Sequence, residues 1–197
     1  MLTLHATSGG DAVLVSGEIV EALGPYEELS AAHPSARVRR WPGLLTPGLL
    51  NPYGPEILES TYHPDPREAD SFGTAPIGGA RAREIFSAEP SRLGPSARRG
   101  VQRLLAHGTV AIGGELKSKP ALDAVRGAGL VFAARPAQLP GPVSLSPRPL
   151  VLLPPLAVGG PARFAVFDVP AREELVRLGA STCVATVIGG RLVYRGR

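Results

Sequence analysis

The sequence of 197 residues contains a single cysteine, Cys183, and this scarcity excludes several kinds of site. One cysteine cannot form an intrachain disulfide, and it cannot supply the several thiolates of a multi-cysteine zinc site. Cys183 lies within an apolar, strand-like run, where a buried and unreactive thiol is the expected state.

Long apolar segments are also missing. The most apolar stretch, residues 150–158, is interrupted by Pro154 and Pro155 and is far shorter than the roughly 20 residues that cross a bilayer. The sequence does not open with a basic segment followed by an apolar one, so it predicts no signal peptide. We therefore expect a cytoplasmic protein with no membrane partner.

Lysine and aromatic residues are rare, whereas arginine is abundant. Only two of the 21 basic side chains are lysines, and aromatic residues make up 5% of the chain. The basic groups at 37–40 and 98–103 lack the interleaved aromatic side chains that stack on single-stranded bases. A net charge of +4 by itself indicates non-specific attraction, so the sequence predicts no nucleic-acid partner.

The apolar content is nevertheless sufficient for a folded core, because 44% of the residues are hydrophobic. The 24 glycines and 21 prolines indicate many turns and few long helices. A complete eight-stranded α/β barrel needs about 200 residues at the very least, so this length leaves no room for such a barrel beside a second domain.

Apolar patterning predicts short strands near both ends of the chain and helix–strand pairs in the middle. Residues 51–95 are interpreted as mostly loop, and Val38 is expected to face inward. Short loops between helices and strands over 97–134 are typical of a right-handed βαβ unit. The predicted strands are 12–16, 19–23, 36–41, 109–112, 130–134, 150–153, 164–168, 183–188 and 192–194, and the predicted helices are 26–32, 80–86, 97–106, 120–128 and 173–178.

Both ends of the chain resemble the amidohydrolase superfamily. Residues 15–29 (VSGEIVEALGPYEEL) are similar to its opening strands, and 40–51 (RWPGLLTPGLLN) to its entry into the barrel. Residues 164–168 (FAVFD) and 184–194 (VATVIGGRLVY) are similar to its closing strands. The pattern is most similar to the composite domain of imidazolonepropionase- and aminodeoxyfutalosine deaminase-like proteins, a small β-sandwich beside a metal-dependent barrel.

This resemblance implies an α+β fold. Residues 1–50 and 150–197 are expected to form the β-rich composite domain, a small β-sandwich made by the two ends of the chain. Residues 51–149 are expected to form loops and a rudimentary βαβ insertion, the remnant of a truncated barrel.

The sequence departs from the family where the catalytic metal binds. The family carries a His-x-His pair after the stretch that corresponds to 47–51, and Tyr53 and Pro55 stand at those positions here. The proline side chain has no atom that can bind a metal, and neutral tyrosine is a poor ligand. In this family the bound metal activates the attacking water. We therefore expect no metal ligands at Tyr53 and Pro55, and no cofactor.

Four other residues are candidates for catalysis. His63 and Asp65 form the best remaining metal-like pair, although the alternative interpretation is a polar, solvated loop. Glu56 and Glu59 lie three residues apart, so a helix there places them on one face as an acid and a base, or simply as surface charge.

Two functions remain open. The first is an imidazolonepropionase-like pseudoenzyme that has lost metal-dependent catalysis and acts by binding or assembly. Its truncated parallel sheet leaves an edge that a homodimer or a partner protein is expected to cover. The alternative is an active hydrolase of carbon–nitrogen bonds, other than peptide bonds, in a small cyclic or nucleoside-like substrate. That alternative requires zinc or iron in a rebuilt site.

Overall fold

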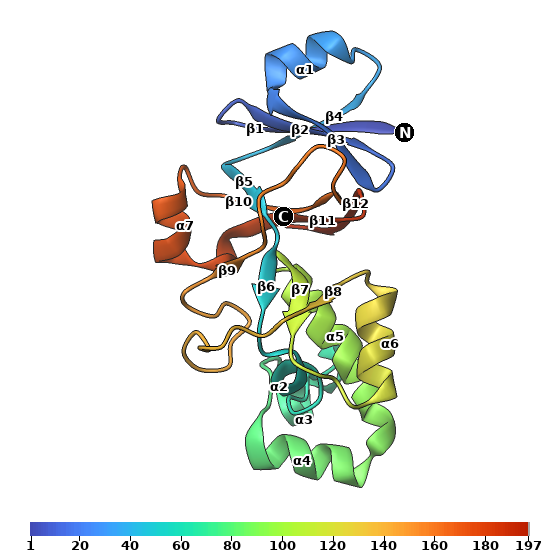
Figure 1. The fold of residues 1–197 in the computed structure, drawn as a ribbon. Helices are drawn as coiled ribbons and strands as arrows, with labels where there is room; N and C mark the ends of the chain where they lie inside the picture. Colours follow the sequence, from blue (N-terminus) through green and yellow to red (C-terminus); the bar gives the residue numbers. More distant parts are fainter. Residues whose placement is uncertain (197) are drawn as a thin grey trace.

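The computed structural model describes residues 1–196, which form three four-stranded sheets arranged one after another along the molecule (Figure 1). Sheet A has the strand order β3-β2-β1-β4, with one parallel pair, β1 and β4, and the helix α1 connects β3 to β4. Its elements are β1 (Leu2–Thr7), β2 (Asp11–Ser16), β3 (Ile19–Pro25), α1 (Tyr26–Ala32) and β4 (Arg37–Trp41).

Two features of sheet A differ from the sequence-based expectation. The central strand β1 was not predicted, and the prediction that Val38 faces inward is wrong, because its side chain is 42% exposed. Val38 pairs with Leu4 and so shares the face covered by α1, but β4 is an edge strand. The residue of β4 that is buried is Trp41.

Sheet B is made mostly by the C-terminal segment and packs against sheet A. Its order is β12-β11-β10-β5, and all neighbouring strands are antiparallel. Val13, Val15 and Val20 from sheet A form one buried cluster with Phe164 and Val187 from sheet B. The expected β-sandwich from the two ends of the chain is therefore confirmed. The strands are β5 (Leu44–Pro47), β10 (Arg163–Phe167), β11 (Cys183–Ile188) and β12 (Arg191–Arg195).

Sheet C is the rudimentary α/β part of the fold and has the order β8-β7-β6-β9. Three of its strands are parallel and β9 is antiparallel to β6, and within the described residues the sheet does not close into a barrel. The elements are β6 (Leu49–Asn51), α5 (Leu93–Leu105), β7 (Thr109–Gly113), α6 (Lys119–Gly127), β8 (Val131–Ala133) and β9 (Val151–Leu152).

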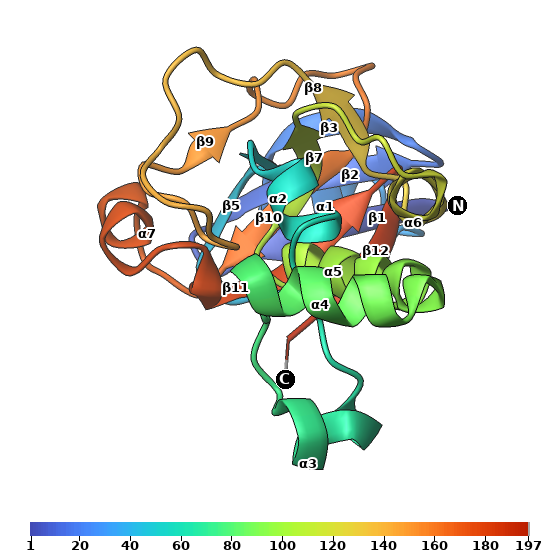
Figure 2. The same ribbon diagram turned by 90° about the horizontal axis from the view of Figure 1, so that it is seen from below.

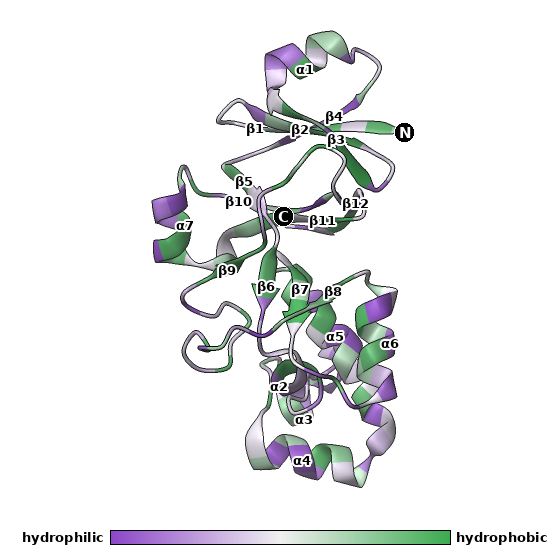
Figure 3. Cartoon of the chain, in the orientation of Figure 1, coloured by the Kyte–Doolittle hydropathy of each residue, from purple (hydrophilic) through white to green (hydrophobic). Residues whose placement is uncertain are grey.

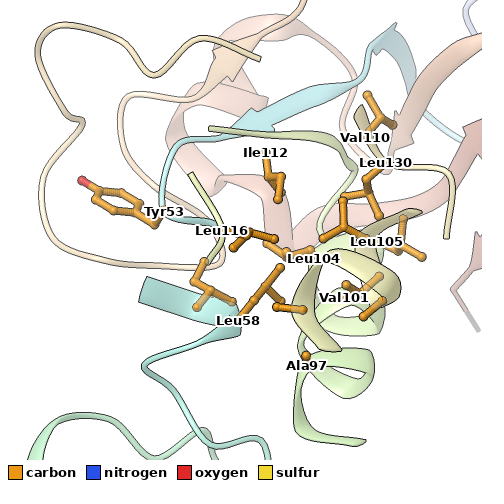
Figure 4. Close-up of a cluster of buried hydrophobic side chains, with 14 of the residues drawn as sticks. Tyr53, Leu58, Ala97, Val101, Leu104, Leu105, Val110, Ile112, Leu116 and Leu130 are labelled. Atoms are coloured by element: carbon orange, nitrogen blue, oxygen red, sulfur yellow. The ribbon is translucent and has the colours of Figure 1, made fainter. Parts of the chain in front are cut away.

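The helix α5 shows why this part folds as the sequence predicts. Its buried face carries Val101, Leu104 and Leu105, and arginines occupy the opposite face, as a surface helix requires. These side chains meet β7 and α6 in the largest core cluster (Figure 4). The hydropathy colouring places the apolar strands of all three sheets inside and the charged helix faces outside (Figure 3).

Residues 51–95 are more helical than expected. The predicted helix at 80–86 is confirmed within α4 (Gly79–Ala88), but α2 (Gly54–Leu58) and α3 (Ala69–Phe72) were not predicted. Viewed from below, α2 lies across the ends of the sheet C strands and α3 projects from the body of the molecule (Figure 2). The predicted helix at 173–178 is confirmed as α7 (Arg172–Leu178). None of the described helices is long and apolar enough to cross a membrane.

Candidate functional site

The carboxyl end of strand β6 is closed by the loop between β8 and β9, which runs past it (Figure 1). The Asn51 amide donates to the Ser144 carbonyl oxygen at 2.9 Å, and its side-chain oxygen accepts from the backbone N–H of Tyr53 at 3.0 Å. The buried Tyr53 hydroxyl donates to the carbonyl oxygen of Gly141. Two side chains therefore fix this loop over the strand end.

These residues do not fit the metal that the resembled family holds here. The Tyr53 hydroxyl is already a hydrogen-bond donor, and the ring of Pro55 offers no donor atom to a cation. Within residues 1–196 no three histidine, cysteine, aspartate or glutamate side chains converge as metal ligands do. The strand end thus lacks a ligand set for that ion.

A cavity of about 620 Å³ lies beside α2 and is called the α2 cavity below. Apolar walls alternate with hydroxyl groups and two imidazoles, a mixture common in sites for small organic molecules. The lining residues are Glu56, Ile57, Ser60, Thr61, His63, Pro76, Gly78, Gly79, His107, Val143, Ser144, Leu145 and Ser146.

The two candidate glutamates have different partners. Glu56 accepts two hydrogen bonds from the guanidinium of Arg135, at 2.8 and 3.1 Å. Glu59 accepts from the backbone N–H groups of Lys117 and Ser118, at 2.8 and 2.6 Å, just before α6 begins. Each carboxylate thus links α2 or the residue after it to a distant segment of the chain. The two carboxylates have no hydrogen-bond partner in common, so they are not arranged as an acid–base pair.

His63 is buried, so its interpretation as part of a solvated loop is wrong. Its backbone N–H donates to Ser96 Oγ at 2.9 Å, and its Nε2 lies 2.9 Å from the carbonyl oxygen of Ile57, which fixes Nε2 as the protonated nitrogen. Burial lowers the pKa of His63 to about 4, and the positive charges of Arg103 and Arg99 act in the same direction. The neutral ring leaves Nδ1 as an acceptor without a partner among the described residues.

Asp65 lies two residues further on and caps a short helix. It accepts from the backbone N–H of Arg67 at 3.0 Å and so begins a short 3-10 helix. The guanidinium of Arg99 pairs with its other oxygen at 3.3 Å. Asp65 lines a separate hollow with Tyr62 and Arg92, whereas His63 lines the α2 cavity, so the two are not placed as a ligand pair.

Sequence reasoning missed Arg135 and the 141–146 loop, which lie in the part of 51–149 that was expected to form loops. The available signal was position: Arg135 lies two residues after the end of β8, and ligands of α/β sheets lie beyond the carboxyl ends of the strands. His107 lines the α2 cavity, and its Nδ1 lies 2.7 Å from the carbonyl oxygen of Arg103, close to the end of α5.

The bacterial imidazolonepropionase-like composite domain is the family whose model matches the sequence, over residues 12–36. Those residues form β3, α1 and most of β2 in sheet A. The match confirms the amidohydrolase-type resemblance of this N-terminal segment. No curated protein matches the sequence.

Several solved structures are partly similar to the chain. N-isopropylammelide isopropylaminohydrolase from Burkholderia multivorans has a TM-score of 0.45 at 17% identity, over 71% of this chain and 38% of that one. Aminofutalosine deaminase from Helicobacter pylori has a TM-score of 0.41 at 12% identity, over 74% and 36%. An adenosine deaminase from Xanthomonas campestris with bound zinc has a TM-score of 0.38 at 15% identity, over 66% and 32%. The chain spans between 32% and 38% of the length of each of these proteins.

Proposed function

We propose that this chain is a pseudoenzyme of the amidohydrolase type, which binds a small heterocyclic molecule in the α2 cavity without a metal. The observation that carries the proposal is the closed end of β6. Asn51 and Tyr53 use their polar atoms to hold the 141–145 loop there, at the position where the resembled family binds its catalytic ion.

The other candidate groups support the loss of catalysis. A general base must lie within hydrogen-bond reach of the substrate proton. Glu56 is held by Arg135 in a bidentate pair, and Glu59 is held through Oε1 by two backbone N–H groups and does not line the α2 cavity. Moving either carboxylate away from these partners towards a substrate leaves a charged or polar group without its partner, which costs about 1–3 kcal/mol.

The chemistry of the α2 cavity supports a neutral ligand of nucleobase or nucleoside size. Its volume of about 620 Å³ lies within the range for small-molecule sites. Ile57, Val143 and Leu145 offer apolar contact to a flat ring, and Thr61 and Ser144 offer hydroxyl groups. His63 lines the cavity, and its buried Nδ1 is an acceptor without a partner among the described residues, so a ligand N–H that reaches this atom satisfies it.

The alternative, an active carbon–nitrogen hydrolase with rebuilt zinc or iron, lacks comparable support. It needs three or four converging ligands, and its two best candidates, His63 and Asp65, line different hollows.

The test is a titration of the isotope-labelled protein, with EDTA present, followed by two-dimensional NMR. Adenine, guanine and adenosine serve as probes, because each is a flat heterocycle with N–H donors. We expect at least one of them to shift the amide signals of Ile57, Thr61 and Val143, equally with and without EDTA. The absence of such shifts with all three probes, or release of ammonia from adenosine once zinc is added, contradicts the proposal.

A conservative variant sharpens this test. In His63→Gln the new amide N–H is expected to donate to the Ile57 carbonyl as Nε2 does, whereas the ring acceptor Nδ1 is replaced by an amide oxygen at a different position. Losing one hydrogen bond to the ligand is expected to weaken binding about tenfold. His33→Gln, which changes a histidine outside the cavity, is the control and is expected to bind as the parent does.

Self-association is the second part of the proposal, and it rests on strand β8. This strand forms one edge of the parallel part of sheet C, and its Phe132 side chain is 45% exposed. Uncovered parallel edges are rare, so a second copy of the chain is expected to cover this edge.

Light scattering after gel filtration is expected to show that the parent protein is a dimer and that the Phe132→Glu variant is a monomer. The control Val176→Glu, on the exposed side of α7, is expected to leave the dimer intact. A monomeric parent protein contradicts this part.

A further inference from the structure

A second cavity, of about 480 Å³, lies where sheet B meets the end of α6 and is called the arginine cavity below. Its walls come from the turn before β3, from α5, from the end of α6 and from the strands β10, β11 and β12. The charged side chains that line it are Glu18, Arg126, Arg163 and Arg191.

Strand register explains why two of these arginines converge. In sheet B, Ile188 of β11 is paired with Arg163 on one side and with Arg191 on the other. Directly paired residues of antiparallel strands point to the same face. Ile188 packs into the core cluster of α5 and α6, so both arginines project from the sheet face that meets these helices.

The third arginine comes from the last turn of α6. A cation is favoured at the C-terminal end of a helix, and Arg126 lies at this position. The backbone carbonyls of Arg126 and Val125 accept from the N–H groups of Gly129 and Leu130. In the described part of the chain, neither carbonyl accepts a hydrogen bond from the three arginine side chains of the cavity.

The three guanidinium groups have no acidic partner within the described residues. None of them forms an ion pair or a side-chain hydrogen bond there, and Glu18 forms none either. Moreover, the Nε of Arg163 is buried without an acceptor within residues 1–196. A buried N–H without a partner is unfavourable, and like charges gathered around one cavity repel each other. A bound anion relieves both costs.

We infer that the arginine cavity binds a small polyanion, a molecule with at least two phosphate or carboxylate groups. Guanidinium groups bind such oxyanions through paired N–H donors, and three of them around one cavity suit more than one negative group. The cavity is small and lacks aromatic side chains, which favours a compact ligand over a nucleic-acid strand. This site is separate from the α2 cavity and does not depend on its ligand.

The test is calorimetric titration of the full chain with pyrophosphate and, separately, with citrate, at constant ionic strength. Tighter binding of pyrophosphate identifies phosphate groups as the ligand chemistry, and tighter binding of citrate identifies carboxylates. Arg163→Gln and Arg191→Gln are each expected to weaken binding about tenfold, because each removes a charge-assisted hydrogen bond. Both changes keep most of the side-chain stem, and unchanged melting temperatures without ligand establish that the variants fold.

Two further variants separate a built site from general attraction. Glu18→Gln removes the only acidic side chain of the cavity and is expected to tighten binding about threefold. Arg83→Gln, on the exposed side of α4, removes the same charge elsewhere and is expected to change nothing.

Three results overturn the inference. The first is that neither anion gives a heat of binding, and the second is that Arg83→Gln weakens binding as much as Arg163→Gln does. The third is that a DNA oligonucleotide binds more tightly than both small anions and depends on Arg163 in the same way.

Discussion

Replacing Gly43 by alanine is expected to lower the free energy of unfolding by about 4 kcal/mol, because two separate costs combine there. Gly43 has φ +70°, in the left-handed region, and a Cβ atom there is placed 2.1 Å from the carbonyl oxygen of Phe167. The backbone nitrogen of Val169 lies only 2.7 Å from the same position. These neighbours are backbone atoms where sheets A and B meet, so moving them aside costs free energy.

Gly73 is the matched control for this experiment. It has the same φ of +70°, but a Cβ atom there has no neighbour within 4 Å. Gly73→Ala is therefore expected to cost only the strain of its backbone conformation, φ +70° and ψ −166°, about 1–3 kcal/mol. Chemical denaturation of both variants measures the difference, and equal losses contradict the close approach of Gly43 to Phe167.

Acidification from pH 7 to pH 4 is expected to destabilise the protein strongly through His5 and His63. Burial lowers the pKa of His5 to about 4, helped by the charge of Arg39, and burial likewise lowers that of His63 to about 4. The unfolded chain takes up these protons near the ordinary pKa of 6.5, whereas the folded chain does not. Stability contributed by the neutral rings is therefore complete above pH 6.5 and is lost as the pH falls towards 4.

The slope of this loss is measurable. Each histidine contributes up to about 1.4 kcal/mol per pH unit in the steepest part of the window, so denaturation at about pH 5, between the folded and unfolded pKa values, is expected to show that these two rings take up about two protons on unfolding. His63→Gln is expected to reduce the uptake to about one. The same substitution at His33 is the control, and a slope that His63→Gln leaves unchanged contradicts the burial of this ring.

The two buried histidines differ in how far the sequence reveals them. His5 accepts a hydrogen bond from the Trp41 indole at 3.1 Å, across the parallel pair β1 and β4. The strand β1 was not predicted, so this contact was not foreseeable. His63 follows the poorly patterned stretch after β6, where proline and glycine indicate a loop but not whether it is buried.

Local sequence patterns predicted the elements whose apolar residues all face one core. In α5, Val101, Leu104 and Leu105 repeat at helical spacing because they meet one core, and this repeat is visible in the sequence alone. Apolar runs also predicted β10 and β11, and a resemblance at the two ends of the chain predicted their sandwich with sheet A. By contrast, Val38 looks like an inward residue, and only its place on an edge strand decides that it is exposed.

The sequence was enough to predict the sandwich of the chain's two ends and the helix–strand order of its middle, and a resemblance led to the proposal that Tyr53 and Pro55 stand at two metal-ligand positions. The tertiary structure alone decided the partners of the polar groups, because hydrogen bonds and ion pairs join residues far apart in the chain. It linked Glu56 to Arg135, 79 residues away, and placed Arg126 beside Arg163 and Arg191 around one cavity. Spacing along the chain reports which face of an element is apolar, but not which distant segment that face will meet.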